Sequence, residues 1–144
     1  MDEPALRSMN EIRDVLARLA QLADAGDVDA YVALMTDDVV WVMPASPHVG
    51  LAASERAGRS AIAAGAHERL AAGLQGPGSA TMHTVTTTSV SVASSGDEAI
   101  ADSSFVFWTS LGSTPTPTSV GRYHDTFRLV DGAWKLARRE IRFG

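Results

Sequence analysis

The feature that most constrains this chain is a set of four long segments in its second half that are rich in strand-forming residues. They are dominated by Thr, Val, Phe, Tyr and Trp and cover residues 80–93, 98–111, 118–130 and 133–143. Short turn-forming stretches separate them: Ser95-Gly96-Asp97, Pro115-Thr116-Pro117 and Asp131-Gly132. The last is the most specific, because a two-residue hairpin turn needs positive φ angles that Asp and Gly tolerate. We predict four strands joined as an antiparallel meander.

The first half of the chain instead predicts helices. Ser8-Met9-Asn10-Glu11 has the spacing of a capping box, and apolar residues at helical spacing follow it as far as Gly26. Asp27 can cap a second, shorter helix, and the alanine-rich stretch before Gly76-Pro77-Gly78 favours a third. The expected order is a helix at 9–25, a short helix through Met35, a strand at 38–43, a long loop at 44–58 and a helix at 60–74.

Helices gathered before the strands indicate an α+β fold, with the three helices packed on a curved antiparallel sheet around an internal pocket. The 144 residues suit a single domain over residues 1–144. No internal repeat interrupts this arrangement.

Composition excludes several classes of function. The net charge of −5 has no basic stripe that could follow a phosphate backbone, so we expect no nucleic-acid partner. No apolar run approaches the roughly 20 residues of a membrane span, and Met1 to Asn10 do not resemble a leader, which predicts a soluble, cytoplasmic protein without a membrane partner. There is no cysteine, which removes thiolate nucleophiles and cysteine-bound zinc.

Two polar residues stand out as candidates for chemistry. His83 lies within a predicted strand, where an imidazole can act as a general base near neutral pH, or can be an ordinary residue of the outer face or the core. Asp24 lies near the C-terminal end of the first helix, where the helix dipole disfavours a negative charge by about 0.3–1 kcal/mol. The carboxylate of Asp24 therefore either has a partner or is a solvated helix-end charge.

The third strand-like segment carries an acid on its apolar face. Tyr123, Asp125 and Phe127 alternate with Arg122, His124 and Arg128, so Asp125 shares a face with two aromatic residues. A buried carboxylate must be paired or protonated, which makes Asp125 either the partner of an arginine or a pocket acid with a raised pKa. Trp41 and Phe105 are bulky enough to line a pocket, although such residues are also common in plain cores.

Metal and nucleotide motifs are absent from the sequence. His48, His67, His83 and His124 are scattered without metal-binding spacing. There is no glycine-rich phosphate loop and no nucleophile-elbow motif. We therefore predict a protein that uses neither a metal nor an organic cofactor.

Several segments together resemble the SnoaL-like branch of the nuclear-transport-factor-2-like superfamily. They are Gly121-Arg122-Tyr123-His124-Asp125-Thr126-Phe127, Asp131-Gly132-Ala133-Trp134-Lys135-Leu136, Asp37-Asp38-Val39-Val40-Trp41, Gly58-Arg59-Ser60-Ala61-Ile62 and His83 early in its strand. The resemblance spans nearly the whole chain and implies a cone-shaped sheet with helices enclosing a pocket. The superfamily includes scytalone dehydratase, a steroid isomerase, polyketide cyclases, a dehydrochlorinase and the small subunit of ring-hydroxylating dioxygenases.

The resemblance also implies roles for three residues. His83 matches the catalytic histidine of the dehydratase and dehydrochlorinase members, and Asp24 matches the acid that orients it. Arg139 matches a pocket arginine, although it could instead be a surface charge or the ion-pair partner of Asp125. Leu19 stands where the dehydrochlorinase has a lysine, which disfavours halide elimination.

Three functions follow as hypotheses. The first is a cofactor-independent lyase or isomerase that acts on a small, largely apolar, polyketide- or steroid-like molecule, with Asp24, His83 and Arg139 as catalytic residues. Substrate would then be bound by Trp41, Phe105, Tyr123 and Asp125.

The alternatives are a non-catalytic module that binds a small ligand, and a structural subunit like that of the dioxygenases. We also expect a homodimer formed through the open sheet face.

Overall fold

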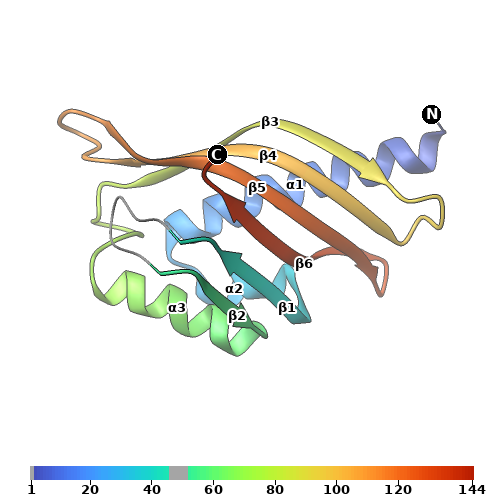
Figure 1. The fold of residues 1–144 in the computed structure, drawn as a ribbon, viewed down its shortest axis with the longest axis horizontal. Helices are drawn as coiled ribbons and strands as arrows, with labels where there is room; N and C mark the ends of the chain where they lie inside the picture. The colour runs from blue at the N-terminus through green and yellow to red at the C-terminus, as the bar shows by residue number, and fades with distance from the viewer. Residues whose placement is uncertain (1, 46–51) are drawn as a thin grey trace.

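The computed structural model describes residues 2–45 and 52–144 (Figure 1). Three helices and six strands follow one another in the order α1 (Glu3–Ala25), α2 (Val28–Ala33), β1 (Met35–Met43), β2 (Ser54–Ala57), α3 (Arg59–Ala71), β3 (Met82–Val92), β4 (Glu98–Thr109), β5 (Thr116–Val130) and β6 (Ala133–Arg142). The predicted α+β class is confirmed.

The strands form one curved, unclosed sheet in the order β2-β1-β6-β5-β4-β3. The helices lie on one side of it, and α1 runs beneath the long β3, β4 and β5 strands (Figure 1). The four predicted strands of the second half form the antiparallel meander β3-β4-β5-β6. The prediction of a wholly antiparallel sheet is wrong at one pair, because β1 runs parallel to β6.

Helix α1 begins earlier than the sequence pattern predicted. The carboxylate of Asp2 accepts a hydrogen bond of 2.8 Å from the backbone N–H of Ala5, and Pro4 lies in the first turn. Asp2 therefore caps the helix, and the predicted capping box at Ser8 is wrong because Ser8 is already inside the helix. Gly26 ends the helix in the left-handed conformation, as expected.

The segment between α1 and α3 contains more strand than predicted. Asp27 caps α2 as expected, but α2 ends at Ala33 and β1 starts at Met35. The predicted loop at 44–58 contains the short strand β2, which pairs with β1. The small and charged residues of β2 have little strand propensity of their own, so pairing with β1 determines its conformation. Residues 46–51 of that loop, His48 included, lie outside the described residues.

The hairpin between β5 and β6 confirms the turn prediction. Asp131 and Gly132 have φ angles of 50° and 79°, which are the positive values that a primed two-residue turn requires. This turn sets the register of β5 and β6 as far as Phe127 and Leu136, and an irregularity between Thr126 and Phe127 then shifts the pairing so that Asp125 lies opposite Arg139.

The core lies between α1 and the concave face of the sheet. Ile12, Leu16 and Leu19 recur at helical spacing on α1 and are buried against strand residues such as Phe127 and Leu136. Within the described residues, no helix combines the length and the apolar character that a membrane span requires.

Phe127 offers a direct test of this core. Its side chain is fully buried, so Phe127→Ala should lower the free energy of unfolding by about 3–5 kcal/mol through lost burial and an unfilled cavity. Phe143→Ala is the matched control, because Phe143 is 41% exposed. Denaturant titration of both variants makes the comparison. Equal effects of the two substitutions would contradict this assignment of the core.

Candidate functional site

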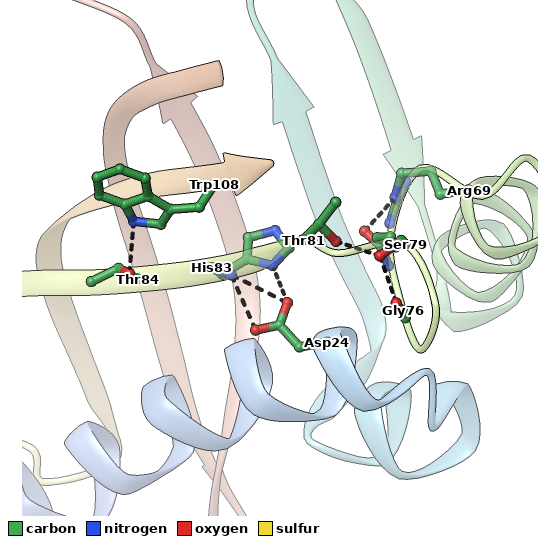
Figure 2. Close-up of polar contacts among 9 residues, drawn as sticks. Asp24, Arg69, Gly76, Ser79, Thr81, His83, Thr84 and Trp108 are labelled. Atoms are coloured by element: carbon green, nitrogen blue, oxygen red, sulfur yellow. Dashed lines mark hydrogen bonds and ion pairs between the residues drawn. The ribbon is translucent and has the colours of Figure 1, made fainter. Parts of the chain in front are cut away.

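Asp24 and His83 form a hydrogen-bonded pair between α1 and β3 (Figure 2). The Nδ1 atom of His83 lies 2.7 Å from Oδ1 of Asp24. The backbone N–H of His83 also donates to the carboxylate, at 3.2 Å from Oδ1 and 3.0 Å from Oδ2. The side chains of His83 and Asp24 are only 19% and 21% exposed. The predicted contact between these two residues is therefore present.

The geometry of the pair selects one tautomer of His83. An ionised carboxylate only accepts hydrogen bonds, so Nδ1 carries the ring proton and donates it to Asp24. In the neutral ring Nε2 is then the acceptor nitrogen, and no described residue hydrogen-bonds to it. An imidazole held in this way is oriented as a proton acceptor at Nε2.

The position of Asp24 explains why this contact forms. The last turn of α1 presents free carbonyl groups and a partial negative charge, so a carboxylate there is unfavourable unless it finds donors. Two donors on His83, the backbone N–H and the ring N–H, satisfy it. The contact thus also docks the C-terminal end of α1 on β3, which explains why an acid off the centre of the apolar stripe is nonetheless largely buried.

An aromatic row continues from His83 along the concave face of the sheet. The His83 ring packs against Phe107 with ring centroids 4.7 Å apart. Two residues along β4, Phe105 stacks on Tyr123 at 4.4 Å with nearly parallel planes. This row connects the Asp24–His83 pair to the centre of the sheet.

Arg139 and Asp125 form a buried ion pair at the centre of the sheet. The guanidinium donates from Nε and Nη2 to the two carboxylate oxygens, each at 2.8 Å. The residues are only 4% and 0% exposed. Burial raises the pKa of Asp125 and the charge of Arg139 opposes that rise, while Asp125 raises the pKa of Arg139. Because both charge-assisted bonds are short, we take the pair as ionised at neutral pH.

The guanidinium of Arg139 lies over two aromatic rings. It is 3.7 Å from the centre of the Tyr123 ring and 5.1 Å from that of Trp41. Burial is the main cause that raises the pKa of Tyr123, and the charge of Arg139 opposes that rise. Tyr123 is therefore a neutral phenol.

A cavity of about 310 Å³ opens beside this cluster, between β1, β2, α2 and α3. Its lining combines apolar and cationic side chains: Tyr31, Trp41, Met43, Ala52, Ser54, Arg56, Ile62 and Arg69. The volume lies at the lower end of the range for small-molecule sites, about 300–1,000 Å³. Of the predicted site residues, Trp41 belongs to this lining and also contacts Arg139.

A family comparison identifies the chain. Residues 4–140 match the model of the SnoaL-like domain. The chain belongs to the SnoaL-like family. The fold and the resemblance predicted from sequence are therefore confirmed, whereas no curated protein matches the chain significantly.

Solved structures place this SnoaL-like domain among proteins of the nuclear-transport-factor-2-like fold. All three examples below come from Novosphingobium aromaticivorans. A protein of cystatin-like fold is 28% identical, with a TM-score of 0.74 over 92% of this chain and 79% of that one. A candidate scytalone dehydratase is 23% identical, with a TM-score of 0.78 over 100% and 89%. The β subunit of a candidate aromatic-ring-hydroxylating dioxygenase is 21% identical, with a TM-score of 0.77 over 98% and 92%.

The structure sorts the predicted site residues of this SnoaL-like domain into two groups. Asp24 meets His83 at the end of α1, whereas Arg139 lies at the centre of the sheet with Asp125, Tyr123 and Trp41. Of the two alternatives for Asp125, the arginine partner is the one observed. Phe105 joins this second group by stacking on Tyr123.

Sequence reasoning missed the two cationic residues of the cavity, Arg56 and Arg69. Arg69 had a visible pattern, because it falls on the same helical face of α3 as Ile62 and Ala66, at spacings of seven and three residues. Arg56 lay in the predicted loop, where no sequence pattern indicated that it would face a cavity. No group of three or more His, Asp or Glu side chains among residues 2–45 and 52–144 could hold a metal ion.

The buried ion pair makes a testable contribution to stability. Asp125→Asn leaves the Arg139 cation buried without its counter-charge, so we expect unfolding to become easier by about 3–5 kcal/mol. Replacing both residues, as in Asp125→Leu with Arg139→Met, should recover much of that loss because no buried charge remains. Thermal and denaturant unfolding of the parent, the Asp125→Asn variant and the double variant measure these changes in the free energy of unfolding.

The matched control is Asp38→Asn, which removes a carboxylate paired with Arg128 on the exposed surface. We expect no measurable change there, because water and salt screen such pairs. A double variant no more stable than Asp125→Asn would argue against the ion-pair explanation.

Proposed function

We propose that this SnoaL-like domain is a cofactor-independent lyase or isomerase that acts on a small, largely apolar carbonyl compound. His83 takes a proton from the carbon next to the carbonyl, and the electron pair of that C–H bond moves toward the carbonyl oxygen to give an enolate. In a dehydration, the enolate electrons then form the C=C bond as the β-hydroxyl leaves, and the proton held by His83 passes to it so that water is released. In an isomerisation, the same proton returns to another carbon.

The hydrogen bond of 2.7 Å between Asp24 and His83 Nδ1 is the observation that carries this proposal. It fixes the ring, keeps the proton on Nδ1 and leaves Nε2 as the base. Asp24 acts here as a positioning residue. The likeness to a candidate scytalone dehydratase agrees with a dehydration, although it supports the fold alone.

The developing negative charge needs a donor, and Tyr123 is the better of the two candidates. The Nε and Nη2 groups of Arg139 already donate to Asp125, whereas the phenol of Tyr123 is neutral and can donate to substrate. Arg139 lies under the Tyr123 ring and makes that phenol a stronger donor. Arg139 then assists through Tyr123, while Trp41, Phe105 and Asp125 shape the surrounding site.

Solvent exchange tests the proton abstraction without knowledge of the natural substrate. A panel of cyclic ketones and hydroxy-ketones is incubated with the protein in D₂O, and deuterium incorporation next to the carbonyl is followed by NMR. We expect catalysed exchange with at least one member, a loss of about 10²- to 10⁴-fold in His83→Gln, and a smaller loss in Asp24→Asn.

A second histidine–aspartate pair provides the control. His124 Nδ1 lies 2.6 Å from Asp102 on the outer face of the sheet, where the pair is more exposed. His124→Gln should leave the exchange rate unchanged. Equal losses in His83→Gln and His124→Gln, or exchange that survives His83→Gln, would contradict the assignment of His83 as the base.

Two non-catalytic functions are the alternatives to this proposal, and each has its own test. A protein that binds members of the panel without exchange would be a ligand-binding module. The likeness to a dioxygenase β subunit favours a structural role, which copurification with a large Rieske-type chain would support.

We further propose that the domain forms a homodimer through the outer face of its sheet. Apolar side chains gather there on neighbouring strands, where Met82 pairs with Trp108 and Val106 pairs with Val120. Val120 is 59% exposed. Burial of this patch against a second copy would remove apolar surface from water.

Sedimentation velocity tests the dimer. The parent protein should sediment as a dimer at micromolar concentration, and Val120→Glu should shift it toward the monomer because it would bury an unpaired charge. Glu98→Gln, at the far end of β4, is the control and should leave the dimer intact. A parent protein that sediments as a clean monomer would overturn this proposal.

A further inference from the structure

We propose that the cavity between β1, β2, α2 and α3 is a binding site for a small aromatic carboxylic acid, with Arg69 as the residue that recognises the carboxylate. The proposal concerns binding alone and does not depend on proton abstraction by His83. It rests on the charge of the cavity, the way its two arginines are held, and its apolar walls.

Arg69 brings a charge into the cavity without an acidic partner. It lies on the inward face of α3 with Ile62 and Ala66, and it is half-buried. Its Nε donates to the amide oxygen of Gln75 at 3.1 Å, and Gln75 is itself buried. Among the described residues no carboxylate lies within ion-pair distance of Arg69, and residues 46–51 contain no Asp or Glu. A half-buried guanidinium with a neutral partner favours an anion from outside.

Arg56 adds a second positive charge that is held in place. It lies opposite Trp41 on β2, and its guanidinium donates to the backbone carbonyl of Ala61 and to Glu68, both at 3.3 Å. A Cβ at Gly65 would come within 2.6 Å of Arg56 Nη1, so the glycine makes room for the guanidinium. Glu68 is exposed and offsets the charge of Arg56 only in part.

The charge of the cavity is opposite to that of the protein as a whole. The chain has a net charge of −5, yet the described residues that line the cavity include two arginines and no Asp or Glu. Burial raises the pKa of Tyr31 in the cavity wall, and the charges of Arg139 and Arg69 oppose that rise while the charge of Asp125 adds to it. Such a site concentrates anions.

The remaining walls select an apolar, planar body for the ligand. Trp41, Tyr31, Met43 and Ile62 present aromatic and aliphatic surface beside the two cations. The volume of about 310 Å³ restricts the ligand to one or two rings. A planar carboxylate matches the paired N–H donors of a guanidinium. An aromatic acid can therefore contact the arginines with its carboxylate and the apolar side chains of the lining with its ring.

Isothermal titration of the full chain with 2-naphthoate and with its neutral isostere 2-naphthamide tests the proposal. We expect the acid to bind at least about tenfold more tightly than the amide. Arg69→Gln should remove that preference while leaving amide binding unchanged, because only the charge-assisted contact is lost. Arg69→Lys should recover part of it. Circular dichroism and a thermal melt of each variant verify folding.

The matched control is Arg13→Gln, which removes an exposed arginine of α1 far from the cavity lining and should bind both probes as the parent does. No binding of 2-naphthoate at millimolar concentration, equal affinity for acid and amide, or unchanged preference in Arg69→Gln would each overturn the assignment.

Discussion

The ion pair between Asp125 and Arg139 is the interaction on which the interior of this protein depends. Two charges at the centre of a sheet are stable only when each satisfies the other, and both short bonds here require Asp125 on β5 to lie opposite Arg139 on β6. Once Arg139 is fixed, its guanidinium lies over the rings of Tyr123 and Trp41. The concave face thus has a rigid polar centre. The aromatic rings around it pack against the guanidinium of Arg139, whose charge is balanced by Asp125.

The end of α1 shows a different relation between stability and chemistry. An acid in the last turn of a helix is unfavourable by itself, and the donors of His83 offset that cost. The same contact fixes the tautomer of an imidazole. One contact therefore docks a helix on a sheet and prepares a base, which illustrates how a locally unfavourable residue can indicate a site.

The sequence was sufficient where local chemistry decides the structure, and insufficient where distant segments do. Asp131-Gly132 predicted its turn because only a few residue types tolerate those φ angles, and the alternation around Tyr123 placed Asp125 on the inner face. Strand β2 was missed because its conformation comes from pairing with β1 rather than from its own residues. The contact of Asp24 with His83 was expected only through a family resemblance, since the helical phase of Asp24 pointed away from the apolar stripe. Arg69 shows a pattern that single-sequence reasoning could have used, namely a cation at core spacing.

The parallel pairing of β1 with β6 has a consequence for how the protein acquires its shape during synthesis. Trp41 and Arg139 are neighbours across that pair although about two thirds of the chain separates them in sequence. A ribosome delivers residues in order, so β1 and β2 wait as an unattached hairpin while the meander is made. The centre of the sheet can close only when β6 emerges, and the closing of so long a loop slows folding. Until then the edge of β1 that pairs with β6 lacks its neighbour in the sheet.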